Sequence, residues 1–320
     1  MNRFTWHGGG IAAAKAHYGE GDWLDLSTGI NPEPWPGADR VKIDWQALPS
    51  EDGLAELERK AAAHFGVDPA FVCALPGTEI GLRIVTGLLP EPAFHLSPSY
   101  RTHGDMLGGA APLAREHWRD AAGGTLILAN PNNPDGHVTA PERLAEMLAA
   151  GWLVVDEAFA DTDPAIGMGS HVADDARLLI FRSFGKFFGL AGLRLGFAVG
   201  PRWLLAQIRA RLGAWPVSAA AIAIGAAAYA DRPWVEAMRE RLRDRAAALD
   251  AVLFGAGHEP LGECPLFRLI ATDDATALFE RLARQAILTR PFDHDPRWLR
   301  FGVPGSDAQL QRLARALGDD

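Results

Sequence analysis

Polar side chains that could share one reaction site occur in three separate clusters of the sequence. They are residues 130–136 (NPNNPDG), Asp156-Glu157, and residues 183–186 (SFGK). Each cluster directly follows a short apolar run that is typical of a buried strand. Lysine can serve as a nucleophile, and carboxylate and amide groups can orient a ligand. Because ligands bind at the carboxyl ends of the strands in α/β sheets, we expect one convergent site.

Each cluster also has a purely structural interpretation. The sequence at 133–136, Asn-Pro-Asp-Gly, is a common turn. Asp156 could cap a helix, and a single lysine such as Lys186 is most often solvated. The order of the three clusters and their position after apolar runs favour the functional interpretation.

Strands and helices are predicted to alternate through the first two thirds of the chain. Apolar runs predict strands at 71–75, 93–96, 125–129, 152–156, 178–182 and 195–199. Helical patterns occupy 53–65, 78–89, 141–150 and 203–212. Continuous apolar runs indicate strands that are buried on both faces. The fold class is therefore expected to be α/β with a mainly parallel central sheet.

After residue 212 the pattern changes to that of a smaller α+β domain. A helix is predicted at 233–254, followed by elements at 266–271 (strand), 275–285 (helix), 286–290 and 298–303 (strands) and 307–317 (helix). The first 35 or so residues are rich in glycine and proline, and we expect an arm and loop there rather than a core element. The predicted domains are an arm and substrate loop at 1–40, a large domain at 41–212 and a small domain at 213–320.

Composition limits the classes of partner. The 320 residues carry a formal net charge of −9 without a basic block, which argues against nucleic-acid binding. The longest apolar run, 214–230, is interrupted by Pro216 and Gly225, and it falls short of the roughly 18 apolar residues of a membrane span. The N-terminus lacks the apolar segment of a signal peptide, so we expect a cytoplasmic protein without a membrane partner.

The two cysteines favour the same compartment. Cys73 and Cys264 lie far apart in apolar surroundings, which is typical of buried free thiols in a reducing environment rather than of a disulfide. The chain contains neither a CxxC nor an HExxH motif, so no metal site is expected.

The three clusters together resemble the fold-type I PLP-dependent enzymes, specifically the class I/II aminotransferase family. The matching motifs are NPNNPDG at 130–136, DEAF at 156–159 and SFGKFFGLAGLRLGF at 183–197, and the resemblance extends from about residue 25 to residue 303. It implies a PLP-dependent transferase-like large domain, pyridoxal 5′-phosphate (PLP) as the cofactor, and a homodimer with the site near the interface.

The resemblance implies a role for four residues around the PLP ring. Lys186 would carry the cofactor as a Schiff base, and Asp156 would keep the pyridine nitrogen protonated; these are the predicted catalytic residues. Asn133 would donate to the phenolate oxygen. Tyr100 matches an aromatic residue that stacks on the ring, although a buried core tyrosine is the competing interpretation.

Five residues are implied at the cofactor phosphate. Gly77, Thr78 and Glu79 begin a predicted helix, where backbone N–H groups bind phosphate. Ser183 and Arg194 match the hydroxyl and guanidinium contacts of the family. Gly77-Thr78 could also be only a helix cap.

The two ends of the chain suggest the substrate. The HGG sequence at 7–9 and the S-x-x-I-N-P pattern at 27–32 are similar to those of the L-threonine-O-3-phosphate decarboxylases of cobalamin biosynthesis. This similarity implies that His7, Gly8 and Asn31 contact a substrate bearing a phosphate. An N-terminal histidine is usually solvated, so His7 depends on the similarity alone.

Two arginines near the C-terminus complete the predicted substrate site. Arg300 matches the family arginine that binds the substrate α-carboxylate, a geometry suited to a bidentate pair. The same similarity extends to Arg290, which could equally be a surface strand residue.

Two positions depart from the wider family. Phe159 stands where a tyrosine usually donates to the PLP phenolate oxygen, and Leu48 stands where a tyrosine usually reaches the cofactor of the partner subunit. With one donor fewer, the imine pKa should rise, which argues against a plain aspartate-type aminotransferase. Phe159 agrees instead with the decarboxylase group.

The sequence thus predicts decarboxylation of L-threonine O-3-phosphate to (R)-1-amino-2-propanol O-2-phosphate. The alternative is a histidinol-phosphate aminotransferase, which the HGG start and Phe159 count against. A third interpretation is a non-catalytic PLP-fold partner protein. That interpretation is disfavoured by an intact set of functional residues, namely Asn133, Asp156, Lys186, Arg194 and Arg300.

Overall fold

The computed structural model describes residues 2–318 and divides into two compact units. The large unit comprises 34–133 and 138–236; the small unit comprises the chain up to Glu33, the segment 134–137, and the chain from Ala237 onward. These boundaries differ from the predicted ones at 40 and 212. They differ because the N-terminal segment packs within the small unit and because the chain after residue 212 continues in the large unit up to Glu236.

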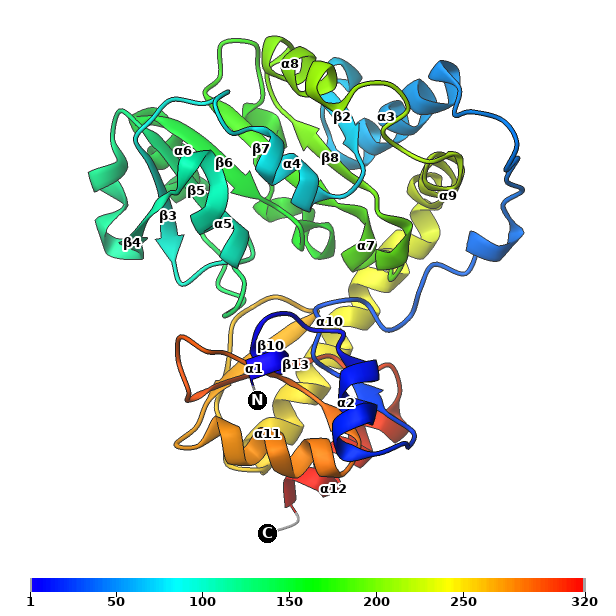
Figure 1. The fold of residues 1–320 in the computed structure, drawn as a ribbon, viewed down its shortest axis with the longest axis vertical. Helices are drawn as coiled ribbons and strands as arrows, with labels where there is room; N and C mark the ends of the chain where they lie inside the picture. Colours follow the sequence, from blue (N-terminus) through cyan, green and yellow to red (C-terminus); the bar gives the residue numbers. More distant parts are fainter. Residues whose placement is uncertain (1, 319–320) are drawn as a thin grey trace. The chain divides into compact units, whose positions relative to one another are not determined.

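The large unit is built on one seven-stranded sheet with the strand order β2-β8-β7-β6-β5-β3-β4 (Figure 1). The strands are β2 (Val72–Leu75), β3 (Ala93–Ser97), β4 (Ala111–Ala114), β5 (Thr125–Ala129), β6 (Trp152–Asp156), β7 (Leu178–Ser183) and β8 (Gly196–Val199). Strands β4, β3, β5, β6 and β7 run parallel, and β8 is antiparallel to both of its neighbours. The predicted mainly parallel α/β fold is therefore confirmed.

Helices cover both faces of this sheet. They are α3 (Glu51–Phe65), α4 (Thr78–Ile84), α5 (Arg101–Asp105), α6 (Pro141–Ala150), α7 (Phe184–Phe187), α8 (Arg202–Leu212) and α9 (Ala219–Ala230). Short 3₁₀ turns connect them: η1 (Ala38–Arg40), η2 (Pro69–Phe71), η3 (Met106–Gly108), η4 (Arg115–Ala121), η5 (Ala160–Thr162), η6 (Pro164–Ile166), η7 (Gly169–His171) and η8 (Ala191–Leu193).

Helices α4 and α8 pack on one face, where Leu82 and Leu204 share a buried cluster with Phe181. Helices α3 and α9 contact each other, and aromatic residues such as Phe65 and Phe197 fill the space beside them.

Local sequence explains where two of these helices begin and end. Helix α3 begins after Ser50, whose side chain accepts a hydrogen bond from the N–H of Gly53 (3.1 Å). It ends at Gly66, which adopts the left-handed conformation of a C-cap. Helix α4 ends at Ile84, earlier than the predicted residue 89, because the chain turns through Gly87 at a φ of +73°.

The small unit contains an antiparallel sheet of order β12-β13-β10-β9 and a separate parallel pair, β1-β11. Its strands are β1 (Leu24–Asp25), β9 (Pro260–Leu261), β10 (Phe267–Ala271), β11 (Ile287–Leu288), β12 (Arg290–Pro291) and β13 (Trp298–Gly302). Its helices are α1 (Asn2–Thr5), α2 (Ile11–Tyr18), α11 (Ala275–Arg284), α12 (Asp307–Gly318) and most of α10 (Arg232–Gly255).

The N-terminal segment is more than an arm. Strand β1 pairs in parallel with β11, and Leu24 and Leu26 are buried. The prediction that the first 35 residues contain no core element is wrong, because these leucines add apolar surface to the core of the small unit.

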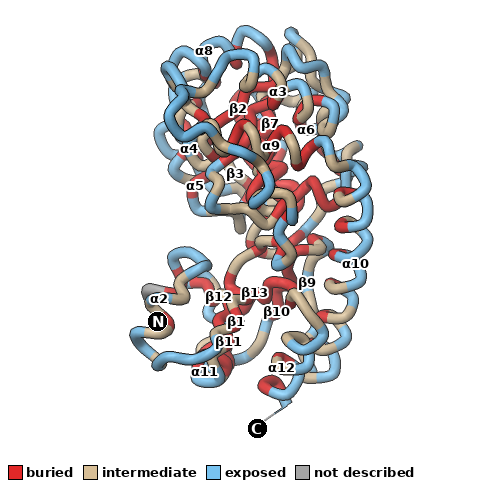
Figure 2. Tube along the Cα trace, turned by 90° about the vertical axis from the view of Figure 1, so that its right-hand side faces the viewer, coloured by how far each residue is buried: buried red, intermediate tan, exposed pale blue. Residues whose placement is uncertain are grey.

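Each unit has its own core, visible as the red strands in Figure 2. Within residues 2–318, no helix is both long enough and apolar enough to cross a membrane. Over the same described range, no group of three or more histidine, cysteine or acidic side chains is arranged to hold a metal ion.

Candidate active site

The carboxyl ends of the parallel strands surround a cavity in the large unit. The cavity measures about 190 Å³, and Ala129, Asp156 and Ser183, the terminal residues of β5, β6 and β7, all line it. All of the residues predicted to bind the cofactor line it as well: Gly77, Thr78, Glu79, Tyr100, Asn133, Asp156, Ser183, Lys186 and Arg194. The structure therefore brings three distant sequence clusters to one place, as expected for strand ends of a parallel sheet.

Lys186 lies in α7, the single helical turn that follows β7. Its Nζ atom is 5.8 Å from the centroid of the Phe159 ring, which also lines the cavity. A cation at this distance from an aromatic face is weakly stabilised by the ring. Phe159 is thus the immediate neighbour of the amine, at the position where a tyrosine hydroxyl would add a polar group.

Asp156 is buried at the end of β6 and held by two hydrogen bonds. Its Oδ1 accepts from the N–H of Ala158 (3.1 Å), and its Oδ2 lies 3.2 Å from Nε2 of His103. His103 is fully buried in α5, and sequence reasoning missed it. The available signal was its spacing, because His103 follows Tyr100 by three residues and can therefore face the same side of one helical turn.

Tyr100 is positioned by Glu79. The Tyr100 hydroxyl donates to Glu79 (3.1 Å), which also accepts from Thr102 (2.9 Å) and from Nε of Arg83 (2.7 Å). Burial, reinforced by the nearby Glu79 carboxylate, raises the pKa of Tyr100 to about 12. The ring therefore remains a neutral aromatic surface at the cavity wall, and the Glu79 side chain acts through Tyr100.

Gly77 and Arg194 form the cationic end of the cavity. Gly77 has a φ of +90°, and a Cβ atom placed on it would lie 2.7 Å from Nη2 of Arg194. Arg194 itself adopts a left-handed conformation, and its Nη1 donates to the carbonyl of Ala191 (3.1 Å). Together with Ser183 and the backbone at Thr78, this arrangement offers donors and positive charge to an anion.

The small unit pairs the two arginines predicted to bind substrate. Arg290 and Arg300 are direct cross-strand partners on β12 and β13. Burial, with the charge of Arg290 added, lowers the pKa of Arg300. Two like charges at opposed positions are unfavourable on their own, so this pair is suited to an anionic ligand.

Both arginines contact the N-terminal segment. Arg300 Nη2 donates to the carbonyl of Ser27 (3.2 Å), and Arg290 Nη2 donates to the carbonyl of Trp6 (2.9 Å). The N–H of Gly9 donates to Oγ of Ser27 (2.7 Å). A Cβ at Gly8 would lie 2.3 Å from the Ser27 carbonyl oxygen, so only glycine allows this approach.

The other two predicted substrate residues differ in burial. His7 is exposed, whereas Asn31 is buried and its Oδ1 accepts from the N–H of Glu33 (2.9 Å). All five predicted substrate residues lie in the small unit, and all predicted cofactor residues lie in the large unit.

Comparison with known proteins identifies the family. Residues 93–317 match the aminotransferase class I and II family. The chain belongs to this family. It is 39% identical to the threonine-phosphate decarboxylase of Sinorhizobium sp, with 97% of each chain covered. It is 37% identical to the threonine-phosphate decarboxylase of Pseudomonas aeruginosa, covering 97% of this chain and 96% of the relative.

Solved structures of similar fold include the histidinol-phosphate aminotransferase of Sinorhizobium meliloti, determined in complex with pyridoxal-5′-phosphate. The two chains share a TM-score of 0.80 and 23% identity, covering 96% of this chain and 93% of the other. At this level of identity the likeness shows the fold alone. It places this aminotransferase family member firmly among α/β proteins with a mainly parallel sheet.

Proposed function

We propose that this protein catalyses the PLP-dependent decarboxylation of L-threonine O-3-phosphate to (R)-1-amino-2-propanol O-2-phosphate in cobalamin biosynthesis. The observation that carries the proposal is the convergence of Asp156, Lys186 and Arg194 in one cavity of a chain whose full-length relatives are named threonine-phosphate decarboxylases. These residues suit an aldehyde cofactor with a basic ring nitrogen and a phosphate.

The cavity residues fit PLP by their chemistry. Lys186 supplies the amine that PLP requires, Asp156 supplies a carboxylate for the ring nitrogen, and Tyr100 supplies an aromatic surface. The close approach of Gly77 to Arg194, which a Cβ would block, leaves a cradle for the phosphate. When bound, PLP withdraws electrons from the substrate Cα.

Asp156 and Lys186 would then have separate roles in the reaction. Asp156, held by Ala158 and His103, would present its carboxylate to the ring nitrogen. The Lys186 amine can hold a proton at Nζ and would donate it to the substrate Cα, where it replaces the carboxylate lost as carbon dioxide.

Substrate binding is assigned to the small-unit residues. We assign the substrate carboxylate to Arg300, because a buried guanidinium favours a bidentate carboxylate. Its paired neighbour Arg290, with His7, Gly8 and Asn31, is assigned to the remainder of the substrate, including its phosphate.

The proposal is tested with purified protein, PLP and L-threonine O-3-phosphate in the absence of any 2-oxo acid. Release of carbon dioxide is expected from the wild type and from Lys60→Ala, whose lysine forms a half-exposed surface pair with Glu56, but not from Lys186→Ala. No release, together with 2-oxoglutarate-dependent turnover of histidinol phosphate, would identify the aminotransferase instead. If neither compound shifts the visible absorption band, the non-catalytic interpretation holds.

We further propose a cytoplasmic homodimer. Two buried free cysteines are typical of a reducing compartment. Trp45, Leu48 and Trp215 of the large unit are large apolar side chains that are mostly exposed, and a second copy of the chain would cover such residues. Light scattering at micromolar concentration should give twice the chain mass; a monomer would exclude the dimer.

A further inference from the structure

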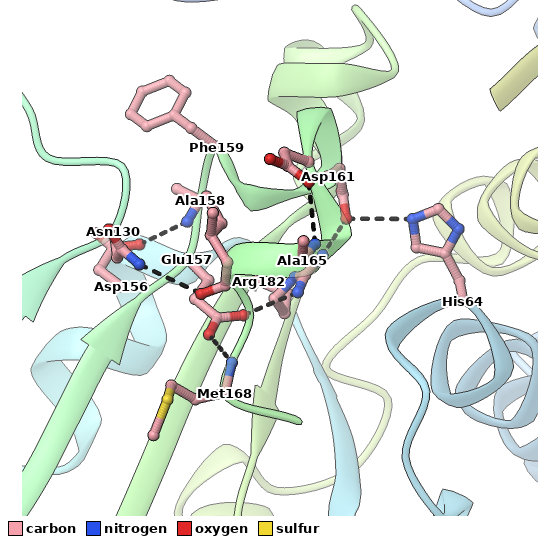
Figure 3. A network of polar contacts seen from close by, with 12 residues as sticks. His64, Asn130, Asp156, Glu157, Ala158, Phe159, Asp161, Ala165, Met168 and Arg182 are labelled. Carbon is pink, nitrogen blue, oxygen red and sulfur yellow. Dashed lines mark hydrogen bonds and ion pairs between the residues drawn. The ribbon is translucent and has the colours of Figure 1, made fainter. Parts of the chain in front are cut away.

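A buried network of charged residues lies behind the strand ends that bear the proposed catalytic residues. Arg182, on β7, donates from Nη1 to Oε2 of Glu157 (2.8 Å) and from Nη2 to Oδ1 of Asp161 (Figure 3). Glu157 Oε1 accepts from the N–H of Met168 (2.7 Å), and Asp161 Oδ1 lies 3.2 Å from Nε2 of His64. One guanidinium therefore bridges two carboxylates that are four residues apart in the chain.

Burying these charged side chains costs free energy of folding, so their presence needs a structural or functional explanation. The Arg182, Glu157 and Asp161 side chains are all more than nine-tenths buried. Burial raises the pKa of Glu157, whereas at Asp161 the charge of Arg182 and the hydrogen bond to His64 outweigh burial and hold its pKa well below the usual range. Replacing such a network by apolar residues is often neutral or stabilising, which makes it weak support for stability alone.

The network holds both ends of the turn that directly follows Asp156 and carries Phe159. Glu157 directly follows Asp156, and Asp161 follows Phe159 by two residues. The N–H of Glu157 donates to the carbonyl of Phe181 on β7 (2.8 Å), and the chain then continues into the 3₁₀ turn η5. Figure 3 shows the Arg182 guanidinium between the Glu157 and Asp161 carboxylates, which stand at the two ends of this segment. Farther along the segment that connects β6 to β7, the carbonyl of Ile166 accepts a hydrogen bond from Nδ2 of Asn130 (3.3 Å).

Arg182 also joins the two strands at the site. It lies one residue before Ser183 on β7, and the neighbouring Phe181 is the register partner of Asp156 on β6. A substitution of Arg182 is therefore expected to affect the turn that follows β6 as well as the end of β7.

We infer that Arg182 is a positioning residue: by holding Glu157 and Asp161 on either side of Phe159, it fixes the Phe159 ring beside Lys186 and the Asp156 carboxylate at the cavity. The inference rests on the proposed PLP chemistry of these residues. It assigns Arg182 no contact with cofactor or substrate.

The test compares Arg182→Lys with the wild type by four measurements: the PLP dissociation constant, the pH midpoint of the visible cofactor band, kcat, and thermal unfolding. A lysine ammonium cannot bridge both carboxylates in the planar geometry of a guanidinium. We expect PLP to dissociate roughly tenfold more readily and kcat to fall by roughly tenfold to a hundredfold, since small misplacements at a reacting centre have such effects. The midpoint should shift, because Asp156 and Phe159 set the surroundings of the Lys186 nitrogen.

A matched control separates positioning from stability. Arg268, in the small unit, is also buried and binds Asp250 (2.6 Å) and the carbonyl of Cys264 (2.6 Å), none of which lines the cavity. Arg268→Lys should lower the melting temperature as Arg182→Lys does, while leaving the band midpoint and the PLP dissociation constant at wild-type values.

A second pair of variants keeps the test open if Arg182→Lys fails to fold. Glu157 uses both oxygens as acceptors, so Glu157→Gln must lose one bond. The contacts of Asp161 with Arg182 and His64 both involve Oδ1, an atom that Asp161→Asn retains. We expect Glu157→Gln to shift the band midpoint and Asp161→Asn to retain it.

Lower melting temperatures for Arg182→Lys and Glu157→Gln with an unchanged midpoint and PLP affinity would overturn the inference. These readouts need no substrate. A wild type that binds PLP but releases no carbon dioxide would therefore refute the proposed reaction while leaving this test in place.

Discussion

At the scale of single residues, the wall of the cavity brings Gly77 and Arg194 unusually close together. The Gly77 Cα faces the Arg194 guanidinium at a distance that leaves no room for a Cβ atom. Both residues have positive φ angles, which is strained for arginine and acceptable for glycine. We interpret these conformations as serving the proposed phosphate site rather than the stability of the turn.

Gly77→Ala should weaken PLP binding. The substitution adds a clash with Arg194 Nη2 and a strained backbone, together worth about 1–3 kcal/mol, so the PLP dissociation constant should rise roughly tenfold. Equilibrium titration of the visible band measures this. Gly192→Ala is the control, because no heavy atom lies within 4 Å of its Cβ position. Equal affinity for Gly77→Ala and wild type would contradict the proposed cradle.

His103 provides a second prediction at this scale. Its Nε2 holds Asp156 at 3.2 Å, so His103→Leu leaves that buried carboxylate with one donor fewer, at a cost of about 1–3 kcal/mol. We expect the rate of carbon dioxide release to fall roughly tenfold, with partial retention in His103→Gln, whose amide can donate. A wild-type rate in His103→Leu would show that Asp156 is oriented without it.

At the scale of elements, strand β2 shows how the sheet ends. β2 pairs only with β8, so its outer edge would present free backbone groups. Glu58 from α3 accepts from the N–H of Ala74 (2.9 Å), and Arg209 from α8 donates to the carbonyl of Val72 (2.6 Å). Glu58 and Arg209 also bind each other (3.0 Å), so one ion pair occupies the place of a missing strand.

Glu58→Ala should therefore destabilise the large unit and expose this edge. Loss of the Ala74 acceptor and of the Arg209 partner is expected to cost about 1–3 kcal/mol, measured by urea unfolding, and to increase aggregation on heating. Glu56→Ala, which breaks only half-exposed surface pairs with Arg59 and Lys60, should change stability by less than about 1 kcal/mol. Similar losses in both variants would argue against a special role at the edge.

The sequence patterns that predicted these elements were of unequal strength. Short apolar runs correctly located six strands of the large sheet, because most of these strands are buried on both faces and are therefore made mainly of apolar residues. Strand β4 (Ala111–Ala114) was missed because it is an exposed edge strand without such a run. Helix α9 (Ala219–Ala230) was missed because its alanines are apolar all round and show no periodic face.

The residues of the candidate site also differed in how well the sequence predicted them. Residues within the three motifs could be recognised from their order alone, and the structure places them at one cavity. His103 and Arg182 could not, and neither could the role of Glu157 within its motif, since these roles depend on partners that the fold brings from other strands and helices. A buried arginine in an apolar strand such as β7 is nevertheless a signal that sequence reasoning can use.

At the scale of the whole molecule, both cysteines lie in the cores of their units. Burial raises the pKa of the Cys73 and Cys264 thiols to about 12 each. A raised pKa keeps the thiol protonated up to that pH, so little of the reactive thiolate exists at pH 9.

Native protein at pH 9 should therefore react with a thiol reagent far more slowly than free glutathione does, whose thiol resembles an ordinary cysteine with a pKa of about 8.5. Unfolding in guanidinium should release two reactive thiols per chain. Rapid labelling of the native protein would show that one of the cores opens readily.

The central claim, that Lys186 carries the cofactor, can be tested on the intact molecule because the chain contains only four lysines. Protein loaded with PLP is reduced with borohydride, which fixes the link between the lysine nitrogen and the PLP aldehyde carbon, and is then digested and analysed by mass spectrometry. We expect PLP on the peptide that contains Lys186 and none on those with Lys15, Lys42 or Lys60. Labelling of one of those three lysines, or no labelling at all, would contradict it.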